Sequence, residues 1–130
     1  DPGNPDTYSH FYTDIQMYNT GPGSPDPQAH MDRFTSWQIA QKANNWSGRN
    51  IPRWSYPEYD QLWKQAATEL EPIKRAALYI AMNDMLITHN VVVPVTWRHE
   101  VSAASTKLRG MEVTAWDSRL WHLAYWYREA

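Results

Sequence analysis

The sequence contains no cysteine, so it has no disulfide framework and no thiolate that could act as a nucleophile or metal ligand. No run of about 18 apolar residues is present, the length that a helix needs to cross a membrane, so we expect no membrane-spanning segment. Twelve Lys and Arg against 14 Asp and Glu give a net charge of −2 without a clustered basic face. That balance argues against nucleic acid as a partner.

Signatures of enzymes are also missing. No G-x-S-x-G, P-loop or G-x-G-x-x-G motif occurs. No two histidines are spaced four apart, as two zinc ligands on one helix face would be; the five are His10, His30, His89, His99 and His122. The carboxylates Asp60 and Asp84 fit helix-surface or capping positions. We therefore predict that the chain is not an enzyme and needs no metal or cofactor.

Tryptophan and tyrosine are abundant, with eight of each beside only two phenylalanines. These side chains serve either as core residues or as surfaces that contact ligands and partners. One hypothesis is a Trp-rich carbohydrate-binding module or a glycosidase fragment, in which sugars stack on Trp and carboxylates supply the chemistry. Such modules usually show many short alternating strands, whereas this sequence has two clear helical patterns.

The clearest pattern, over residues 54–95, predicts a helix hairpin followed by a strand. Ser55 and Glu58 have the spacing of a capping box, and Pro57 suits the first turn of a helix. Glu71-Pro72 ends the first helix and starts the second, which gives helices at about 56–70 and 72–89. Their apolar stripes are Tyr59, Leu62, Trp63, Ala66, Ala67 and Leu70, then Leu78, Tyr79, Met82, Met85 and Leu86.

The other patterns are shorter. Residues 19–27, with two Gly and three Pro, predict an ordered loop that cannot be helical. The apolar positions of 28–43 favour a helix with Met31 and Phe34 on its buried face. Alternation or β-branched runs predict strands at 14–18, 91–97, 101–105, 111–114 and 124–128, with one helical turn at 117–122.

The order of these motifs resembles a known family. The quoted residues are Pro25-Asp26-Pro27, Pro57-Glu58-Tyr59-Asp60-x-Leu62, Lys74-Arg75 with Leu78-Tyr79, and Val93-Pro94-Val95. They are similar to the C-terminal part of family 5 extracellular solute-binding proteins, the dipeptide/oligopeptide-binding class of bacterial ABC importers. The resemblance covers about residue 14 to the end and implies an α+β fold, with the hairpin packed on a small mixed sheet. It implies the C-terminal portion of a two-lobed periplasmic-binding-protein fold.

Family members are about four times longer, so the resemblance implies that residues 1–130 are a single fragment. The fragment would hold part of the second lobe and the segment that returns to the first. The implied function is to bind a peptide-like or other small solute between two lobes and deliver it to the ABC transporter permease subunits. The implied location is periplasmic or extracellular, membrane-associated in a Gram-positive source. An isolated fragment of this kind exposes surface and is expected to self-associate.

Two segments border the ligand in this family. The first matches the loop residues Asn19, Thr20, Gly21, Gly23 and Asp26. Gly23 stands where peptide-binding members carry an Asp that holds the ligand's amino terminus. A peptide with a free amino terminus is therefore unexpected as the ligand unless Asp26 or a group in the missing lobe substitutes. The second follows the Pro94-Val95 strand. There Trp97 either stacks on a ligand or packs inward, and Arg98 either pairs with a carboxylate or is solvated.

Overall fold

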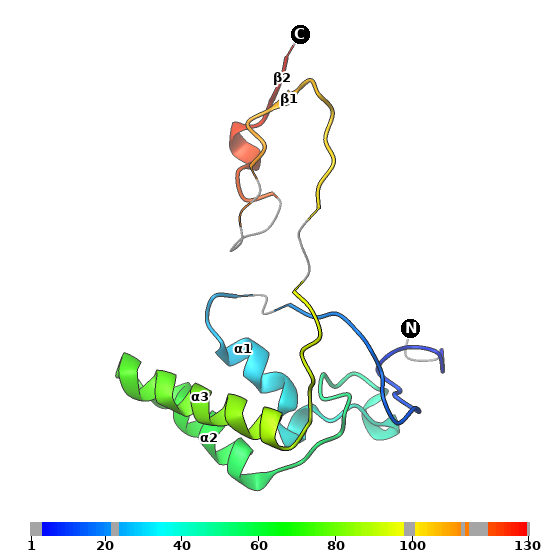
Figure 1. Ribbon diagram of the computed structural model, residues 1–130, viewed down its shortest axis with the longest axis vertical. Coiled ribbons are helices and arrows are strands. Elements are labelled where there is room, and N and C mark those ends of the chain that lie inside the picture. Colours follow the sequence, from blue (N-terminus) through cyan, green and yellow to red (C-terminus); the bar gives the residue numbers. More distant parts are fainter. Residues whose placement is uncertain (1–3, 22–23, 98–100, 113, 115–119, 130) are drawn as a thin grey trace. The chain divides into compact units, whose positions relative to one another are not determined.

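The computed structural model describes residues 4–21, 24–97, 101–112, 114 and 120–129 (Figure 1). The chain forms two compact units, residues 1–93 and 94–130. The described part of the first unit contains α-helices and short 3₁₀ turns, and that of the second contains a two-stranded antiparallel sheet. The protein is therefore of the α+β class.

The predicted helix hairpin is confirmed in the first unit. Helix α2 spans Pro57–Thr68 and α3 spans Pro72–Thr88, and both begin at the proline that the sequence indicated. Figure 1 shows the two helices side by side, with the short helix α1 (Gln28–Met31) beside them. Proline fixes the φ angle of the first helical residue and removes an N–H that has no helical partner there.

The N-terminal caps differ from the expectation. The residue before α2 is Tyr56, and no side chain caps that helix, so the predicted Ser55–Glu58 capping box is wrong. The cap of α3 is real. The carboxylate of Glu71 accepts hydrogen bonds from the backbone N–H groups of Ile73 and Lys74, both at 2.9 Å. An acidic side chain here satisfies donors that the helix itself leaves free.

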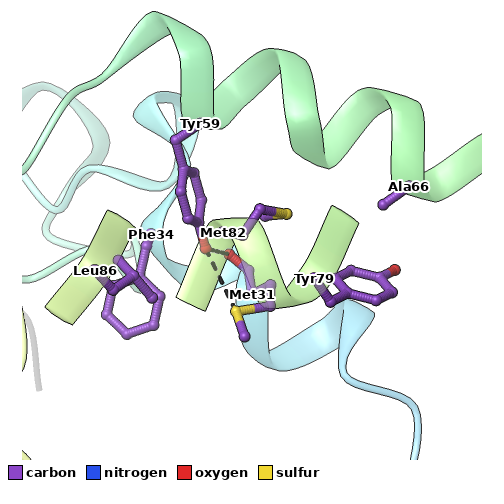
Figure 2. Close-up of a cluster of buried hydrophobic side chains, with 7 residues drawn as sticks. All are labelled: Met31, Phe34, Tyr59, Ala66, Tyr79, Met82 and Leu86. Atoms are coloured by element: carbon purple, nitrogen blue, oxygen red, sulfur yellow. Dashed lines mark hydrogen bonds between the residues drawn. The ribbon is translucent and has the colours of Figure 1, made fainter. Parts of the chain in front are cut away.

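The core lies where the hairpin packs on the segment before it (Figure 2). Tyr59 is fully buried, and its hydroxyl donates a 2.8 Å hydrogen bond to the backbone carbonyl of Met31. The buried members of this cluster are Met31, Phe34, Tyr59, Ala66, Tyr79, Met82 and Leu86. The predicted stripes are thus confirmed at their centres, although Ala67 and Leu70 are exposed.

The helix predicted over 28–43 is broken after one turn. Thr35 is extended, with ψ of 154°, and its hydroxyl donates to the carbonyl of Asp32. The Asp60 carboxylate accepts hydrogen bonds from both the backbone N–H and the hydroxyl of Ser36. The backbone N–H of Ser36 therefore has a partner without a helix. The chain continues as 3₁₀ turns η1, η2 and η3, at Asp32–Phe34, Ser36–Gln38 and Lys42–Asn44.

A second cluster holds the N-terminal segment. Arg53 has a positive φ of 56°, and its guanidinium donates to the carbonyls of His10, Phe11 and Ala40. The same group lies 5.3 Å from the centre of the Trp46 ring. Arg53 therefore holds two residues that precede it by more than 40 positions.

The strand predictions are mostly wrong. Residues 14–18, 91–97 and 101–105, and the described part of 111–114, form no ladder, because a strand needs a partner that local sequence does not specify. The sheet is antiparallel rather than mixed, and pairs β1 (Leu108–Arg109) with β2 (Tyr127–Arg128) in the second unit. Only the end of predicted strand 124–128 is paired, because the 3₁₀ turn η4 (Leu123–Tyr125) precedes it.

Two further differences concern these elements. The hairpin buries its stripe on α1 and η1 of its own unit, and the predicted packing on a mixed sheet is therefore corrected. The predicted helical turn at 117–122 lies partly outside the described residues, and its described part, 120–122, forms a turn.

Candidate functional site

The first predicted ligand segment, residues 19–21, is exposed and is fastened to η1 by one arginine. The guanidinium of Arg33 donates to the hydroxyl of Thr20 and, at 3.1 Å, to the carbonyl of Gly21. Asn19 is exposed beside them. The loop therefore offers polar backbone at the surface while its path is fixed by a charged side chain.

His30 lies close to this fastening. Its half-buried position lowers the pKa of the imidazole, and the positive charge of Arg33 lowers it further, whereas a hydrogen bond from the imidazole to the Gly21 backbone acts in the opposite direction. Burial disfavours the charged form of a histidine because that form loses more hydration. The neutral form of His30 is therefore favoured, and Arg33 supplies the positive charge at this part of the loop.

Asp26, the one carboxylate among the predicted site residues, is already engaged. It accepts a 2.9 Å hydrogen bond from the N–H of Gln28 and forms an ion pair with Arg75, with both carboxylate oxygens 3.1 Å from the same nitrogen. The Gln28 hydrogen bond and then the Arg75 contact hold the pKa of Asp26 below its usual value. A ligand ammonium at this carboxylate would compete with Arg75.

Arg75 itself connects the loop to the helix hairpin. It donates to the carbonyl of Ala66 at 3.1 Å, to the side-chain carbonyl of Gln28 at 2.8 Å and to the hydroxyl of Tyr79 at 2.9 Å. Its guanidinium also lies 4.9 Å from the centre of the Tyr79 ring. The Nε–H donates to Ala66 while a terminal nitrogen is shared by the other acceptors, and a lysine ammonium, with a single nitrogen, cannot reproduce both directions. We call Arg75 with Asp26, Gln28 and Tyr79 the arginine latch.

A shallow hollow adjoins the latch. Its wall includes the indole of Trp63, which packs edge-on against Trp37 with ring centres 5.4 Å apart. The second carboxylate of the wall, Asp32, accepts hydrogen bonds from Arg49 at 2.5 Å and Gln38 at 2.7 Å. The lining residues are Ser24, Asp26, Gln28, Ala29, Asp32 and Trp63. Each carboxylate is balanced by an arginine, so the hollow suits a neutral polar solute better than a cation.

The second predicted segment belongs to the other unit. Trp97 is 91% exposed, so its indole does not pack inward as one interpretation held. Gly23 and Arg98 lie outside the described residues. In the structure, Thr20 and Gly21 are thus held by Arg33, and Asp26 is held by Arg75 of helix α3. Trp97 is described only within the second unit.

Sequence reasoning missed the arginines that organise the loop. The sequence shows Arg75 as a motif residue without indicating its role, although its place four residues before Tyr79 on one helix face is a signal for their contact. Arg33, Asp32 and Trp63 carried no signal, because their partners lie on other elements. Only the fold brings these elements together.

The described part of the chain contains neither a metal-binding group nor a membrane-spanning helix. No group of three or more Asp, Glu or His there is arranged to hold a metal ion. None of the helices described above has the length and apolarity to cross a membrane. A scan against protein-family models, a search of curated proteins and a search of solved structures find no match to this chain.

Proposed function

We propose that this chain is the C-terminal portion of the substrate-binding component of an ABC-type importer. It binds a small polar solute without changing it chemically, and the complete protein delivers the solute to the permease subunits from the periplasmic or extracellular side. The single observation that carries the proposal is the ion pair between Asp26 and Arg75.

That ion pair joins two of the motifs on which the family resemblance rests. Asp26 lies in the Pro-Asp-Pro motif of the loop, and Arg75 and Tyr79 belong to the Arg-x-x-Leu-Tyr motif of the second helix. The two motifs are separated by 49 residues, yet their polar side chains hydrogen-bond to one another. A motif pair that fastens a loop to a hairpin gives a physical reason for the two motifs to occur together.

The same geometry narrows the ligand class. Position 23 is glycine, and Asp26 is neutralised by Arg75, so the loop carries no free carboxylate for an ammonium group. Leaving an ammonium in an enclosed site without a counter-charge is costly. Neutral polar solutes, such as peptides with a blocked amino terminus or sugars, therefore fit better than free dipeptides.

Isothermal titration calorimetry on the natural protein that contains this chain tests the proposal. Free dipeptides, their N-acetylated forms and small sugars are titrated in parallel, and the solute is recovered and checked by mass spectrometry. We expect a neutral solute to bind and to be recovered unchanged. The Gly23→Asp variant is the matched comparison, because it restores a carboxylate and should improve binding of free dipeptides over acetylated ones.

Two results would count against the proposal. Chemical turnover of any solute would make the protein an enzyme. Binding of a polysaccharide by the 130-residue chain alone, with no solute bound by the natural protein, would favour the carbohydrate-binding alternative. Within the described residues, however, the only strands are two residues long, which is unlike the many-stranded architecture of such modules.

A further inference from the structure

The hollow beside the arginine latch has only a few acceptor sites left for a ligand. The Asp26 carboxylate accepts from the N–H of Gln28, and both of its oxygens contact one nitrogen of Arg75. A carboxylate has about four acceptor sites, so about one remains on Asp26, whose side chain is 49% exposed. An ammonium group brings three donors and a full charge, whereas a hydroxyl donates once and is neutral. The remaining site therefore fits a hydroxyl.

The second carboxylate of the hollow is occupied in the same way. Asp32 accepts hydrogen bonds from Gln38 at 2.7 Å and from Arg49 at 2.5 Å. It also accepts from the indole N–H of Trp37 at 3.3 Å. By the same count about one acceptor site remains on Asp32. The wall thus offers two separate acceptors, each already balanced by an arginine.

A donor and an apolar surface complete the wall. The side-chain carbonyl of Gln28 accepts from Arg75 at 2.8 Å, which leaves its amide nitrogen as a donor without a partner among the described residues. Trp63 lines the same hollow, and its indole N–H is directed to the backbone carbonyl of Gln28 at 3.4 Å. The face of an indole ring carries negative charge density and attracts C–H groups.

The backbone beside the hollow cannot pair with an extended peptide. Pro25 and Pro27 have no N–H. The N–H of Asp26 donates to the Ser24 hydroxyl oxygen at 3.1 Å, and that of Gln28 is taken by the Asp26 carboxylate. A peptide that adds a strand needs alternating free N–H and C=O groups along an edge. A ligand that bonds through hydroxyls does not, so a sugar fits this wall better than an N-acetylated peptide.

We propose that a neutral pyranose sugar binds in this hollow, with the C–H face of its ring on the Trp63 indole. Its hydroxyls donate to Asp26 and Asp32 and accept from the side-chain amide of Gln28. The hollow has a volume of about 420 Å³, within the range of about 300–1,000 Å³ for small-molecule sites. The assignment rests on the proposed function, because the hollow is shallow and the rest of the natural protein would enclose the sugar.

Titration calorimetry on the natural protein that contains this chain tests the assignment. The probes are glucose, galactose, xylose, maltose and cellobiose, beside N-acetylated dialanine. We expect at least one sugar to bind and the peptide not to bind. Trp63→Leu should weaken that sugar about 10-fold or more, and Trp63→Phe, which keeps a ring face, should weaken it less. Trp121→Leu, the same change in the second unit, is the control and should leave binding unchanged.

A second variant tests the polar contact. Gln28→Glu keeps an oxygen for Arg75 but removes the amide donor, so the fold should persist while sugar binding falls about 3- to 10-fold. Circular dichroism checks that each variant keeps its helices.

The outcomes separate this inference from the proposed function. Chemical turnover of a sugar, or binding of no neutral solute at all, would refute both. Binding of the N-acetylated peptide and of none of the sugars would leave the proposed function standing and overturn the sugar assignment. Sugar binding that Trp63→Leu and Gln28→Glu leave unchanged would place the sugar elsewhere and would overturn the assignment as well.

Discussion

The Tyr59→Phe variant removes one hydroxyl from the centre of the first unit. Tyr59 is fully buried and donates to the Met31 carbonyl at 2.8 Å, so the variant leaves a carbonyl in the core without this donor. An unsatisfied buried polar group costs about 1–3 kcal/mol. With a urea m-value of roughly 2 kcal/mol per molar, the unfolding midpoint should fall by about 0.5–1.5 M. The m-value itself should not change, because the packing surface is preserved.

The matched control is Tyr12→Phe, which removes the same atom from a side chain that is 70% exposed. It should leave the midpoint unchanged, and urea titrations followed by circular dichroism at 222 nm compare the two variants. If Tyr59→Phe costs no more than Tyr12→Phe, the hydrogen bond does not stabilise the core and our interpretation of it is refuted. A large change in the m-value would instead show that the variant alters the folded or unfolded state.

The dependence of folding stability on pH above pH 10 is an independent measure of the surroundings of Tyr59. Burial, and then the charges of Asp32 and Asp60, raise the pKa of Tyr59 above its usual value of 10.0. Above that pH the unfolded chain releases a proton that the folded chain keeps, so stability falls as the pH rises. Tyr18 and Tyr79 are shifted in the same direction and contribute to this fall. Tyr59→Phe should therefore lose less stability per pH unit above pH 10 than the natural sequence does.

Two further predictions concern the loop and a close backbone approach. The Gln28 hydrogen bond and then the Arg75 contact lower the pKa of Asp26, so its contribution to stability is complete above its usual pKa of 3.8 and is lost as the pH falls through the lower folded value. Asp26→Asn should flatten that part of an acid-unfolding curve, and an unchanged curve would show that these two contacts do not stabilise the folded chain. Gly48→Ala should lower the thermal midpoint by several degrees or prevent folding, because its Cβ would lie 2.2 Å from the Gln38 carbonyl oxygen. Gly21→Ala is the control and should be neutral, because a Cβ at that position meets nothing within 4 Å. Equal thermal midpoints for the two variants would contradict this packing.

The sequence predicted the parts of the fold that depend on neighbouring residues. Both hairpin helices begin at a proline, and their stripes repeat with the helical period, so Pro57 and Pro72 located them within one or two residues. The cap before α2 failed because the helix begins after Tyr56, which leaves Ser55 one residue too early. Local spacing thus predicts that a helix exists better than it predicts which residue caps the helix.

The remaining errors have a common cause. The helix expected after Gln28 stops because Asp60, from a distant helix, satisfies the donors of Ser36. The strand expected over 91–97 is absent because a ladder needs a partner strand, and a β-branched run does not supply one. Similarly, no local pattern shows that Asp26 pairs with Arg75. Contacts between distant segments decided each of these cases.

The cluster around Arg53 has a consequence for the order in which the parts of this protein unfold. The N-terminal segment is held to the rest of the first unit by the Arg53 guanidinium and by the buried His10 ring, which packs edge-on against Trp46, whereas the hairpin is held by many buried side chains. Because fewer buried side chains hold it, we expect the N-terminal segment to open and reclose while α2 and α3 stay folded. Amide protons near His10 should exchange with solvent long before those of the hairpin, and a protease should cleave there first. Early opening of this kind would uncover the part of the Trp46 ring that His10 and Tyr12 contact, in an otherwise native molecule.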